Sequence, residues 1–213
     1  MNKLPPEHPL PVDPERVTTS EPGADHPVHL VVTDDLRRSR LTVFFRLILA
    51  IPHLFWALVW GLAVLFVVII AWFAALIKGR VPDGMHNFLA RYLIYTTRLT
   101  GYTNLLANPY PPFHGRPGVS YPIDLHVDPP QPQARWTILL RLLLGIPAMI
   151  LAYVFQQVLG IIAFISWFVC LFIGRMPKGL RDLGAYCLRY QQQTYGYLMF
   201  VTKRYPSLAG PTP

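Results

Sequence analysis

Charged residues are scarce in this chain of 213 residues. They make up 14% of it, against the roughly 25% that is usual in soluble domains, and 53% of the residues are hydrophobic. No Lys, Arg, Asp or Glu lies between Arg46 and Lys78, or between Arg141 and Arg175. Each of these apolar runs is longer than the ~20 residues that a membrane-spanning helix needs. The composition therefore excludes an ordinary soluble domain and predicts an all-α integral membrane protein.

Other features that the sequence lacks exclude several classes of function. The two cysteines, Cys170 and Cys187, provide neither a disulfide framework nor a metal-binding quartet, and the seven histidines have no metal-ligand spacing. There is no GxSxG, phosphate-loop or GxGxxG motif, and no pair of carboxylates lies on a shared helical face for acid–base chemistry. We therefore expect no enzymatic activity, no metal and no cofactor.

Acidic residues are also few. Eleven Asp and Glu stand against nineteen Lys and Arg, which gives a formal net charge of +8. Such a surplus suits either nucleic acid or the anionic surface of a membrane. Because the apolar runs favour the membrane, we expect membrane lipids as partners and no nucleic acid.

An internal repeat covers most of the sequence. A shift of 95 residues aligns 26–111 with 121–206 without a gap, and 27 of the 86 aligned pairs are identical. The identical pairs include Arg40/Arg135, Arg46/Arg141, Pro52/Pro147, Trp72/Trp167, Gly79/Gly174, Arg80/Arg175 and Tyr102/Tyr197. We therefore expect two membrane repeats, 26–113 and 121–206, joined by a linker over 114–120. The proline-rich segment 1–25 lacks the apolar region of a signal peptide and is expected to be a disordered tail, as is the short segment 207–213.

Each repeat is expected to contain three elements. Residues 27–32 and 122–127 show short alternation with β-branched residues and predict a strand. An apolar segment interrupted by a proline follows. After a turn comes a helix, 85–106 or 180–201, in which apolar and aromatic residues recur at spacings of three and four. That side can lie as an interfacial amphipathic helix in the lipid headgroup layer or pack on the protein's own membrane helices, and the sequence leaves both open.

The length and the flanking charges of the apolar runs predict how they cross the membrane. One straight helix over 47–77 would be about 47 Å long at ~1.5 Å per residue, whereas the hydrocarbon core is roughly 30 Å thick. A single tilted helix and a hairpin with its tip near Trp60 and Gly61, matched by Phe155 and Gln156, both resolve this mismatch.

Charge favours the hairpin. The three segments outside the runs carry six, seven and six basic residues, so no segment is depleted of them as the positive-inside rule would require after a single crossing. We therefore predict two hairpins, which form four membrane helices, with both termini in the cytoplasm. A fully spanning hairpin and a re-entrant one both satisfy these charges.

Arginines around the apolar runs are the candidate binding residues. Those that occur in both copies can anchor the topology, or they can hold lipid phosphates or an acidic partner. The candidate set for lipid or partner binding is Arg40, Arg46, Arg80, Arg91, Arg98, Arg135, Arg141, Arg175, Arg181 and Arg189. His53 is the ionisable residue inside the apolar runs, and we interpret it as an interfacial histidine because Ala148 aligns with it in the second copy.

Several motifs stand in a fixed order in the first copy. They are Phe44-Phe45-Arg46, Ile51-Pro52-His53, Ala71-Trp72-Phe73, Gly79-Arg80-x-Pro82-x-Gly84 and Tyr110-Pro111-Pro112-Phe113. With these motifs the chain resembles, from His26 to Pro206, an actinobacterial family of membrane domains of unknown function, whose members commonly carry the domain in tandem. The resemblance implies an actinobacterial, multi-pass plasma-membrane protein and implies no catalytic residues. The second copy departs from the motifs, with Ala148 in place of the histidine.

Two functions follow from these features. We expect a non-enzymatic membrane accessory or scaffold protein, which binds lipid headgroups or a partner membrane complex through its basic cytoplasmic side. Its protein partner would be another membrane protein or a second copy of the chain. The alternative is a small transporter or channel-like protein with a path at the repeat interface, although the apolar runs contain almost no ionisable residue for such a path.

Overall fold

The structure is a computed structural model that describes residues 26–209 of the chain. The predicted tail 1–25 lies outside the described residues, as do residues 210–213 of the predicted C-terminal tail. The elements in chain order are β1 (Val28–Val32), α1 (Arg40–Lys78), α2 (Asp83–Thr103), β2 (Ile123–Val127), α3 (Arg135–Leu139), α4 (Arg141–Ile173) and α5 (Lys178–Leu198). The described chain is thus mostly helical, with a small sheet where the sequence predicts two strands.

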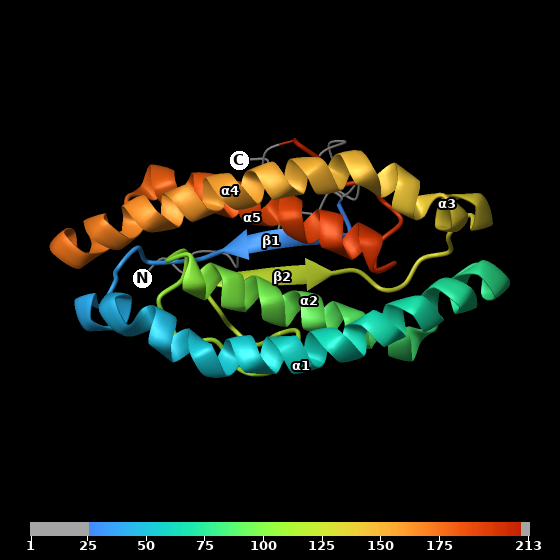
Figure 1. Cartoon of the computed structure of the whole chain (residues 1–213), viewed down its shortest axis with the longest axis horizontal. Coiled ribbons are helices and arrows are strands. Elements are labelled where there is room, and N and C mark those ends of the chain that lie inside the picture. Colours follow the sequence, from blue (N-terminus) through green and yellow to red (C-terminus); the bar gives the residue numbers. More distant parts are fainter. Residues whose placement is uncertain (1–25, 210–213) are drawn as a thin grey trace, which may run out of the picture. The chain divides into compact units, whose positions relative to one another are not determined.

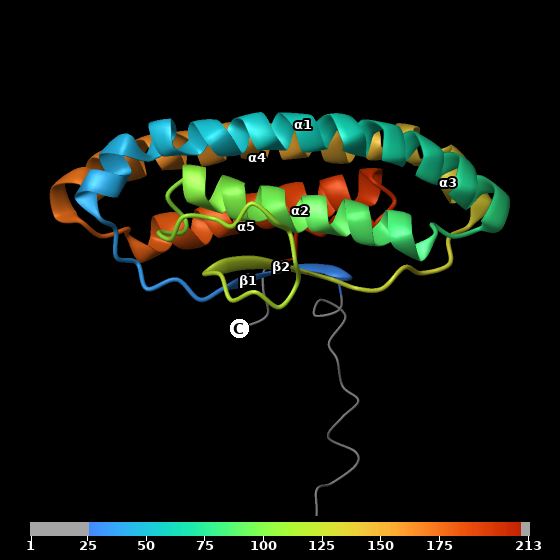
Figure 2. The same ribbon diagram turned by 90° about the horizontal axis from the view of Figure 1, so that it is seen from below.

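The elements of the unit His26–Leu208 are arranged in three layers (Figure 1 and Figure 2). The long helices α1 and α4 form the outer layer, α2 and α5 form the middle layer, and the two strands form the third layer. Each long helix packs along the shorter helix that follows it, α1 on α2 and α4 on α5. The strands contact the helix of the other copy, because β1 lies against α5 and β2 against α2. The two copies are therefore interlocked within one unit.

An approximate two-fold axis through the sheet relates the two copies. The strands pair antiparallel, and Leu30 lies opposite Leu125, its equivalent in the other copy because 125 − 30 = 95. On the other face of the sheet His29 lies opposite His126, with ring centroids 4.7 Å apart. Equivalent residues of antiparallel strands can pair only about a two-fold axis, so the repeat in the sequence is also a repeat in space.

The same symmetry holds at the two ends of the outer layer. The Arg38 N–H donates to the Gly174 carbonyl oxygen, and the equivalent Gln133 N–H donates to the Gly79 carbonyl oxygen, both at 2.9 Å. Gly79 and Gly174 end the long helices in the left-handed conformation, at φ of 72° and 75°, which glycine adopts without steric cost. The end of each long helix is therefore tied to the segment that leads into the other one.

Each apolar run forms a continuous helix, so the predicted hairpins and the count of four membrane helices are wrong. α1 has 39 residues and α4 has 33, and neither turns near Trp60-Gly61 or Phe155-Gln156. A Cβ at Gly61 would lie 2.9 Å from the Tyr92 hydroxyl oxygen, so this glycine marks close packing of α2 and not a turn. The run also lacks the Gly, Pro, Asn and Asp pairs that form tight turns.

Pro52 and Pro147 lie within α1 and α4 and do not end them. Both prolines are exposed on the outer side of their helices. Figure 2 shows α1 bowed, with its middle farther from the sheet than its ends. A proline on this outer, convex side is compatible with the bend, because convex backbone hydrogen bonds are the ones that lengthen when a helix curves.

The amphipathic helices α2 and α5 form the middle layer, and the apolar side of each packs on the protein itself. Leu89, Leu93, Tyr95 and Tyr102 of α2 are all 0% exposed. One side of this helix packs against α1 and another against β2, which leaves little of it for a headgroup layer. Of the two alternatives that the sequence leaves open, packing on the long helices is confirmed.

Candidate membrane-facing surface

The outer side of α1 is a continuous surface of exposed apolar side chains. A narrow stripe of this helix is buried against the rest of the unit, at Val43, Arg46, Ala50, His53, Val64, Ala71 and Ala75. Large apolar side chains between these positions are exposed, among them Leu47 at 73%, Phe55 at 68% and Phe66 at 60%. The pattern is that of a helix with one thin inward stripe and a broad apolar side left uncovered.

α4 repeats this organisation. We define the outer face as the exposed apolar side chains of the two long helices, represented by Phe44, Leu47, Ile51, Phe55, Leu58, Leu62, Phe66, Ile70 and Phe73 of α1 and Leu142, Leu143, Ile146, Ile150, Tyr153, Ile161, Phe164, Phe168 and Phe172 of α4. Covering one such side chain with an apolar medium is worth roughly 1.5–3 kcal/mol. Because soluble monomers rarely expose apolar patches beyond a few hundred Å², the outer face requires an apolar cover.

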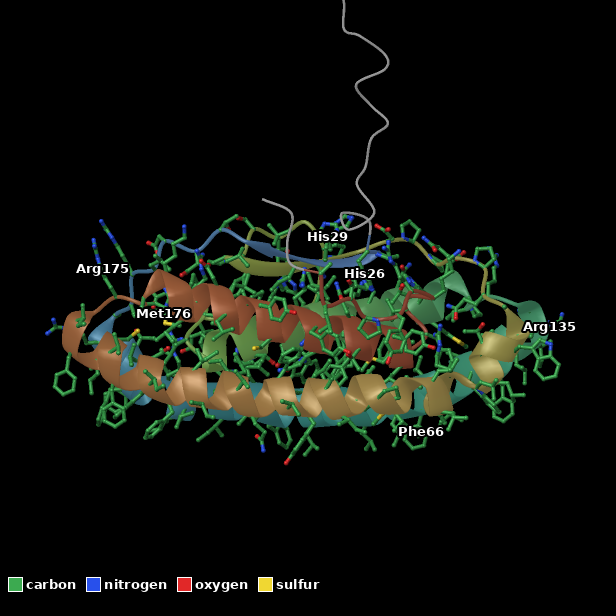
Figure 3. The ribbon with its side chains drawn as sticks, turned by 90° about the horizontal axis from the view of Figure 1, so that it is seen from above. His26, His29, Phe66, Arg135, Arg175 and Met176 are labelled. Carbon is green, nitrogen blue, oxygen red and sulfur yellow. The ribbon has the colours of Figure 1, made fainter. Side chains whose placement is uncertain are left out.

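Exposed arginines lie at both ends of the outer face. Arg40 opens α1 and Arg175 follows α4 at one end, while Arg80 follows α1 and Arg135 opens α3 at the other. We call these four residues the tip arginines. Figure 3 shows Arg135 and Arg175 at opposite ends, with Phe66 pointing away from the sheet. The apolar outer face is therefore bounded by positive charge at each end.

Packing across the copies brings the tip arginines together. The Arg135 guanidinium donates to the Ile77 carbonyl oxygen in the last turn of α1, at 3.3 Å. At the other end the Arg40 Nε lies 3.6 Å from the position that a Cβ would take at Gly174. Each end thus gathers cations from both copies.

Arg46, also in the predicted binding set, is an interior residue with 2% exposure. Its guanidinium donates to the carbonyl oxygens of Tyr102, at 2.6 Å, and Ala107, at 3.0 Å. The guanidinium carbon also lies 4.4 Å from the centre of the Tyr102 ring. Carbonyls at the C-terminal end of a helix lack intrahelical partners and carry the negative end of the helix dipole, so the buried cation stabilises the end of α2.

Arg141 makes the equivalent contacts in the second copy, with 0% exposure. It donates to the Thr202 carbonyl oxygen at 3.1 Å and stacks on the rings of Tyr197, at 4.4 Å, and Phe200, at 4.7 Å. In the described part of the chain neither Arg46 nor Arg141 forms an ion pair with a carboxylate. We assign both arginines to the packing of the shorter helices and not to the binding surface.

Arg98 is also buried, at 0% exposure, and holds the linker. It forms an ion pair with Asp124 at 2.9 Å and donates to the carbonyl oxygens of His114, Arg116 and Val119. The guanidinium therefore fixes the path of the chain from the first copy to β2. Its contacts are all within the unit, and it does not face a ligand.

The other three predicted arginines lie on the sides of α2 and α5. Arg91 is exposed, and Arg181 and Arg189 are half-buried. Arg181 donates to Asp182 at 2.6 Å, and the Arg189 guanidinium lies 5.2 Å from the centre of the Tyr186 ring. Of the ten predicted arginines, the structure therefore places the four tip arginines beside the outer face and distributes the others through the interior and the flanks.

Two motifs of the first copy, Ile51-Pro52-His53 and Tyr110–Phe113, meet at His53. This residue is 0% exposed, its Nδ1 lies 3.0 Å from the Tyr95 hydroxyl oxygen, and the same hydroxyl donates to the His53 carbonyl oxygen. The Phe113 ring stacks on the imidazole at 3.9 Å, and Tyr110 lies 4.6 Å from it. His53 is thus an interior residue that holds the Tyr110–Phe113 segment on α1, so its interpretation as an interfacial histidine is wrong.

Sequence reasoning missed one pair of equivalent side chains, Arg38 and Gln133. Arg38 Nε donates to the Leu105 carbonyl oxygen at 2.9 Å, and Gln133 Nε2 donates to the Phe200 carbonyl oxygen at 3.1 Å. Leu105 and Phe200 both have a left-handed backbone, at φ of 64° and 62°, just beyond α2 and α5. Arginine and glutamine count as a mismatch in the aligned copies, and their shared capacity to donate is the only signal that could have revealed the equivalence.

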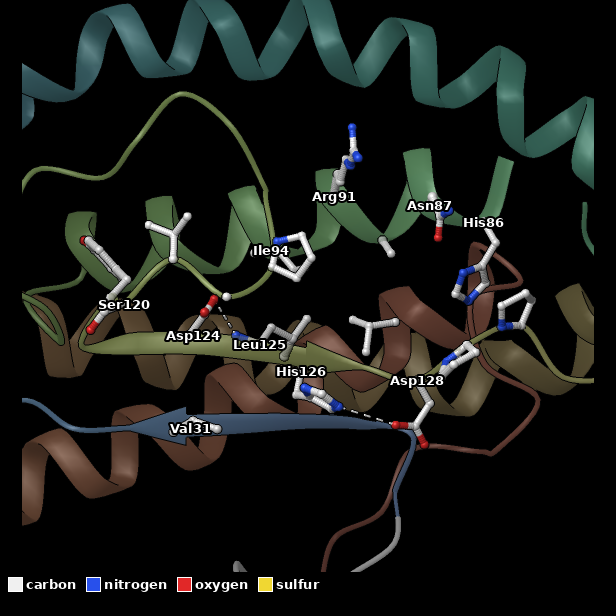
Figure 4. A pocket seen from close by; sticks show the side chains of 18 of the residues that line it. Val31, His86, Asn87, Arg91, Ile94, Ser120, Asp124, Leu125, His126 and Asp128 are labelled. Atoms are coloured by element: carbon white, nitrogen blue, oxygen red, sulfur yellow. Dashed lines mark hydrogen bonds and ion pairs between the residues drawn. The ribbon is translucent and has the colours of Figure 1, made fainter. Parts of the chain in front are cut away.

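A pocket of about 830 Å³ lies between α2, β2 and the linker (Figure 4). Asp83, His86, Arg91, Asp124 and His126 contribute polar groups to its lining. Burial lowers the pKa of His86, against the opposing effect of its hydrogen bond to a backbone carbonyl. In the described residues no group of three His, Cys, Asp or Glu could hold a metal ion. Because the lining carries both signs of charge, it favours no single class of ligand.

The fold and the outer face define a mostly helical tandem-repeat protein with two helices that are long and apolar enough to cross a membrane. The model of the family described as "Domain of unknown function (DUF4389)" matches the chain twice, over residues 40–114 and 135–209. The matches cover more than half of the chain, so the chain belongs to this family and carries two copies of its domain. No curated protein and no solved structure matches the chain.

Proposed function

We propose that the chain is a non-enzymatic membrane accessory or scaffold protein of the plasma membrane. Its outer face anchors it in lipid, and its tip arginines bind anionic headgroups on the cytoplasmic side. The observation that carries this proposal is the concentration of exposed apolar side chains on one layer, bounded by exposed arginines at both ends. Guanidinium groups at the boundary of an apolar surface are suited to lipid phosphates, since each can donate two parallel hydrogen bonds.

The polar side of the unit is the part left for a partner. With the outer face in lipid, the sheet and the linker are on the side directed to the cytoplasm. A membrane protein that docks there, or a second copy of the chain, would meet the exposed His29 and His126 and the mixed charges of the pocket. The transporter alternative gains no specific observation from the described residues.

Fractionation of cells that express the full chain tests the anchor. The protein should stay in the membrane pellet after an alkaline carbonate wash, because the apolar face is held by lipid and not by charge. Release by the wash would contradict the proposal. Purification from native membranes in mild detergent then tests the accessory role: a reproducible partner protein supports it, and flux of an ion or substrate through liposomes that contain the pure protein would overturn it.

Headgroup preference tests the tip arginines. In vesicles with a quencher attached to phosphatidylglycerol or to phosphatidylcholine, tryptophan quenching should show a preference for the anionic lipid. The double variant Arg80→Gln/Arg135→Gln should weaken that preference, by about 1 kcal/mol for each basic residue lost. Arg116→Gln/Lys203→Gln is the matched control, since it removes the same charge from exposed positions that are not tip arginines. Equal losses in both variants would reject the assignment.

A further inference from the structure

We propose that α1 and α4 lie in the plane of the membrane, embedded in the cytoplasmic leaflet, and that neither helix crosses it. This inference rests on the proposed membrane anchor and adds its geometry. The outer face is then the interaction surface, and its partner is one leaflet of a bilayer that contains anionic lipid. Three observations lead to this orientation.

The first observation is that polar groups are packed close to the long helices and would enter the hydrocarbon if these helices spanned the membrane. α2 packs along α1, α5 packs along α4, and both strands pack against these shorter helices. If the long helices crossed the membrane, the Arg98–Asp124 ion pair, the exposed Arg91 and the exposed His126 would enter the hydrocarbon with them. The two-stranded sheet would also bring its unpaired outer edges, and open sheet edges do not occur in contact with lipid. With the helices in the membrane plane, all these groups stay on the aqueous side.

The second observation is the length of the apolar surface. Exposed apolar residues run along α1 from Leu41 to Ile77, so nearly the whole helix needs an apolar cover. At ~1.5 Å per residue the 39-residue helix is about 58 Å long, and it would fit a core of roughly 30 Å only at a tilt of about 60°, beyond the usual ~0–40°. A helix that lies in the membrane plane does not have to fit the thickness of the core, so its length is not restricted.

The third observation is the distribution of positive charge. The segments before the first apolar run, between the two runs, and after the second run carry six, seven and six basic residues, so the positive-inside rule requires an even number of crossings per run. Two crossings are ruled out because each run is one unbroken helix. Zero crossings satisfy both constraints and put every basic segment in the cytoplasm.

The curvature of the outer layer fits this orientation. In Figure 2 the middle of α1 is farthest from the sheet and its ends turn back toward the sheet. An in-plane helix inserts its apolar side about 5–10 Å below the headgroups. Phe66, which points away from the sheet, would then lie among the acyl chains, and the tip arginines would lie at the level of the phosphates.

A second copy fits the outer face less well than a leaflet does. Both ends of the outer face are basic, so two copies that pack face to face with their long helices aligned would place tip arginines against tip arginines. Anionic lipid neutralises these charges, whereas a second copy adds like charges. Charge complementarity therefore favours lipid.

Labelling of variants that each introduce one cysteine, with a membrane-impermeant maleimide, tests the orientation. The variants are Ser39→Cys and Lys78→Cys, at the two ends of α1, and Phe66→Cys on the outer face, each in the full chain. The native Cys170 and Cys187 are 0% and 1% exposed and provide an unlabelled background, which the unmodified chain checks. Intact cells, inside-out vesicles and detergent-solubilised protein are labelled in parallel.

The expected result is that Ser39→Cys and Lys78→Cys are labelled in inside-out vesicles and not in intact cells, and that Phe66→Cys is labelled only in detergent. Labelling of the two ends from opposite sides would show a spanning helix, which overturns this inference and leaves the membrane anchor intact. Labelling of Phe66→Cys without detergent, in protein that carbonate releases, would overturn both. Spontaneous disulfide dimers of Phe66→Cys in the released protein would instead identify a second copy as the cover.

Discussion

The two copies of the domain agree at the buried arginine and the terminal glycine of the long helix and differ at their buried histidines. The first copy buries three histidines, and the second copy has none at the equivalent positions. The equivalent pairs are His26/Tyr121, His53/Ala148 and His86/Arg181. By contrast, both copies keep the buried arginine of the long helix and the left-handed glycine that ends it. The buried arginine at the end of the shorter helix and the glycine with left-handed dihedral angles are kept in both copies, whereas the buried histidines change together with their neighbours, even though His26 and His86 each hydrogen-bond a backbone carbonyl.

The largest expected effect is at the buried arginines, where the two copies are most alike. Arg46 donates to two carbonyl oxygens, of which that of Tyr102 also accepts from the Leu105 N–H, and Arg141 donates to one. Each arginine is thus the partner of one buried acceptor, which costs about 1–3 kcal/mol when left unpaired, so Arg46→Met and Arg141→Met should each destabilise by about 2 kcal/mol. Thermal unfolding in mild detergent measures both. The exposed tip arginine variant Arg40→Met is the control and should change little, and an equal loss in all three variants would refute the assigned contacts.

A smaller effect is expected at one pair of packed positions, on α4 and α5, where the two copies have side chains of different sizes. Gly145 in α4 corresponds to Ala50, and Leu198 in α5 corresponds to Thr103. A Cβ at Gly145 would lie 2.6 Å from a methyl carbon of Leu198, so the larger leucine requires the smaller glycine. Gly145→Ala should therefore destabilise by about 1 kcal/mol, because the clashing atom is the end of a flexible side chain.

The double variant Gly145→Ala/Leu198→Thr gives the second copy the residues of the first. Its loss of stability should be smaller than the sum of the two single losses, which a double-mutant cycle of melting temperatures measures. Gly160→Ala is the control for the helix itself, because a Cβ there would have no neighbour within 4 Å. Strict additivity at Gly145 and Leu198 would show that the two positions do not compensate each other.

The smallest expected effect is on the pH dependence of stability, and it should be confined to the first copy. Burial lowers the pKa of His86 and of His26 below the ordinary histidine value of 6.5. The unfolded chain therefore binds the proton more readily than the folded chain, and stability should fall as the pH drops below about 6.5. Above that pH both states are neutral and these groups contribute no pH dependence.

Melting temperatures between pH 7.5 and pH 5.5 measure this slope. His86→Gln should reduce the loss at low pH, because glutamine can still donate a hydrogen bond to the Val201 carbonyl oxygen but does not titrate. A slope that steepens in His86→Gln would reverse the assigned sign.

The repeat, the strands and the amphipathic helices could be predicted because each depends on local pattern. Alternation over 27–32 and 122–127 located both strands, and the spacing of Tyr95, Leu99 and Tyr102 belongs to a helix that packs on its neighbours. The prediction of hairpins was wrong because the counts of basic residues indicate only whether the number of crossings is even or odd. Zero and two crossings give the same charge distribution, and only the continuous α1 separates them.

The candidate arginines could be predicted as a set but not divided by role. Arg46 and Arg80 are both paired with an identical residue in the second copy, yet one is 2% exposed and the other is exposed at a helix end. Identity between copies reports that a position matters and does not report which way its side chain points. The direction of the Arg46 side chain depends on where the C-terminal end of α2 packs against α1, which only the tertiary structure determines.

By itself the sequence determined that two equivalent units exist, that each contains one long apolar run, and that positive charge surrounds both runs. These properties depend on composition and spacing alone, so no partner element is needed to read them. Only the tertiary structure decided that the runs are unbroken helices in one layer, each with a broad apolar side uncovered. The physical reason is that exposure depends on what packs against a helix: α2 and α5 cover one narrow stripe of each long helix, and the outer face is what remains.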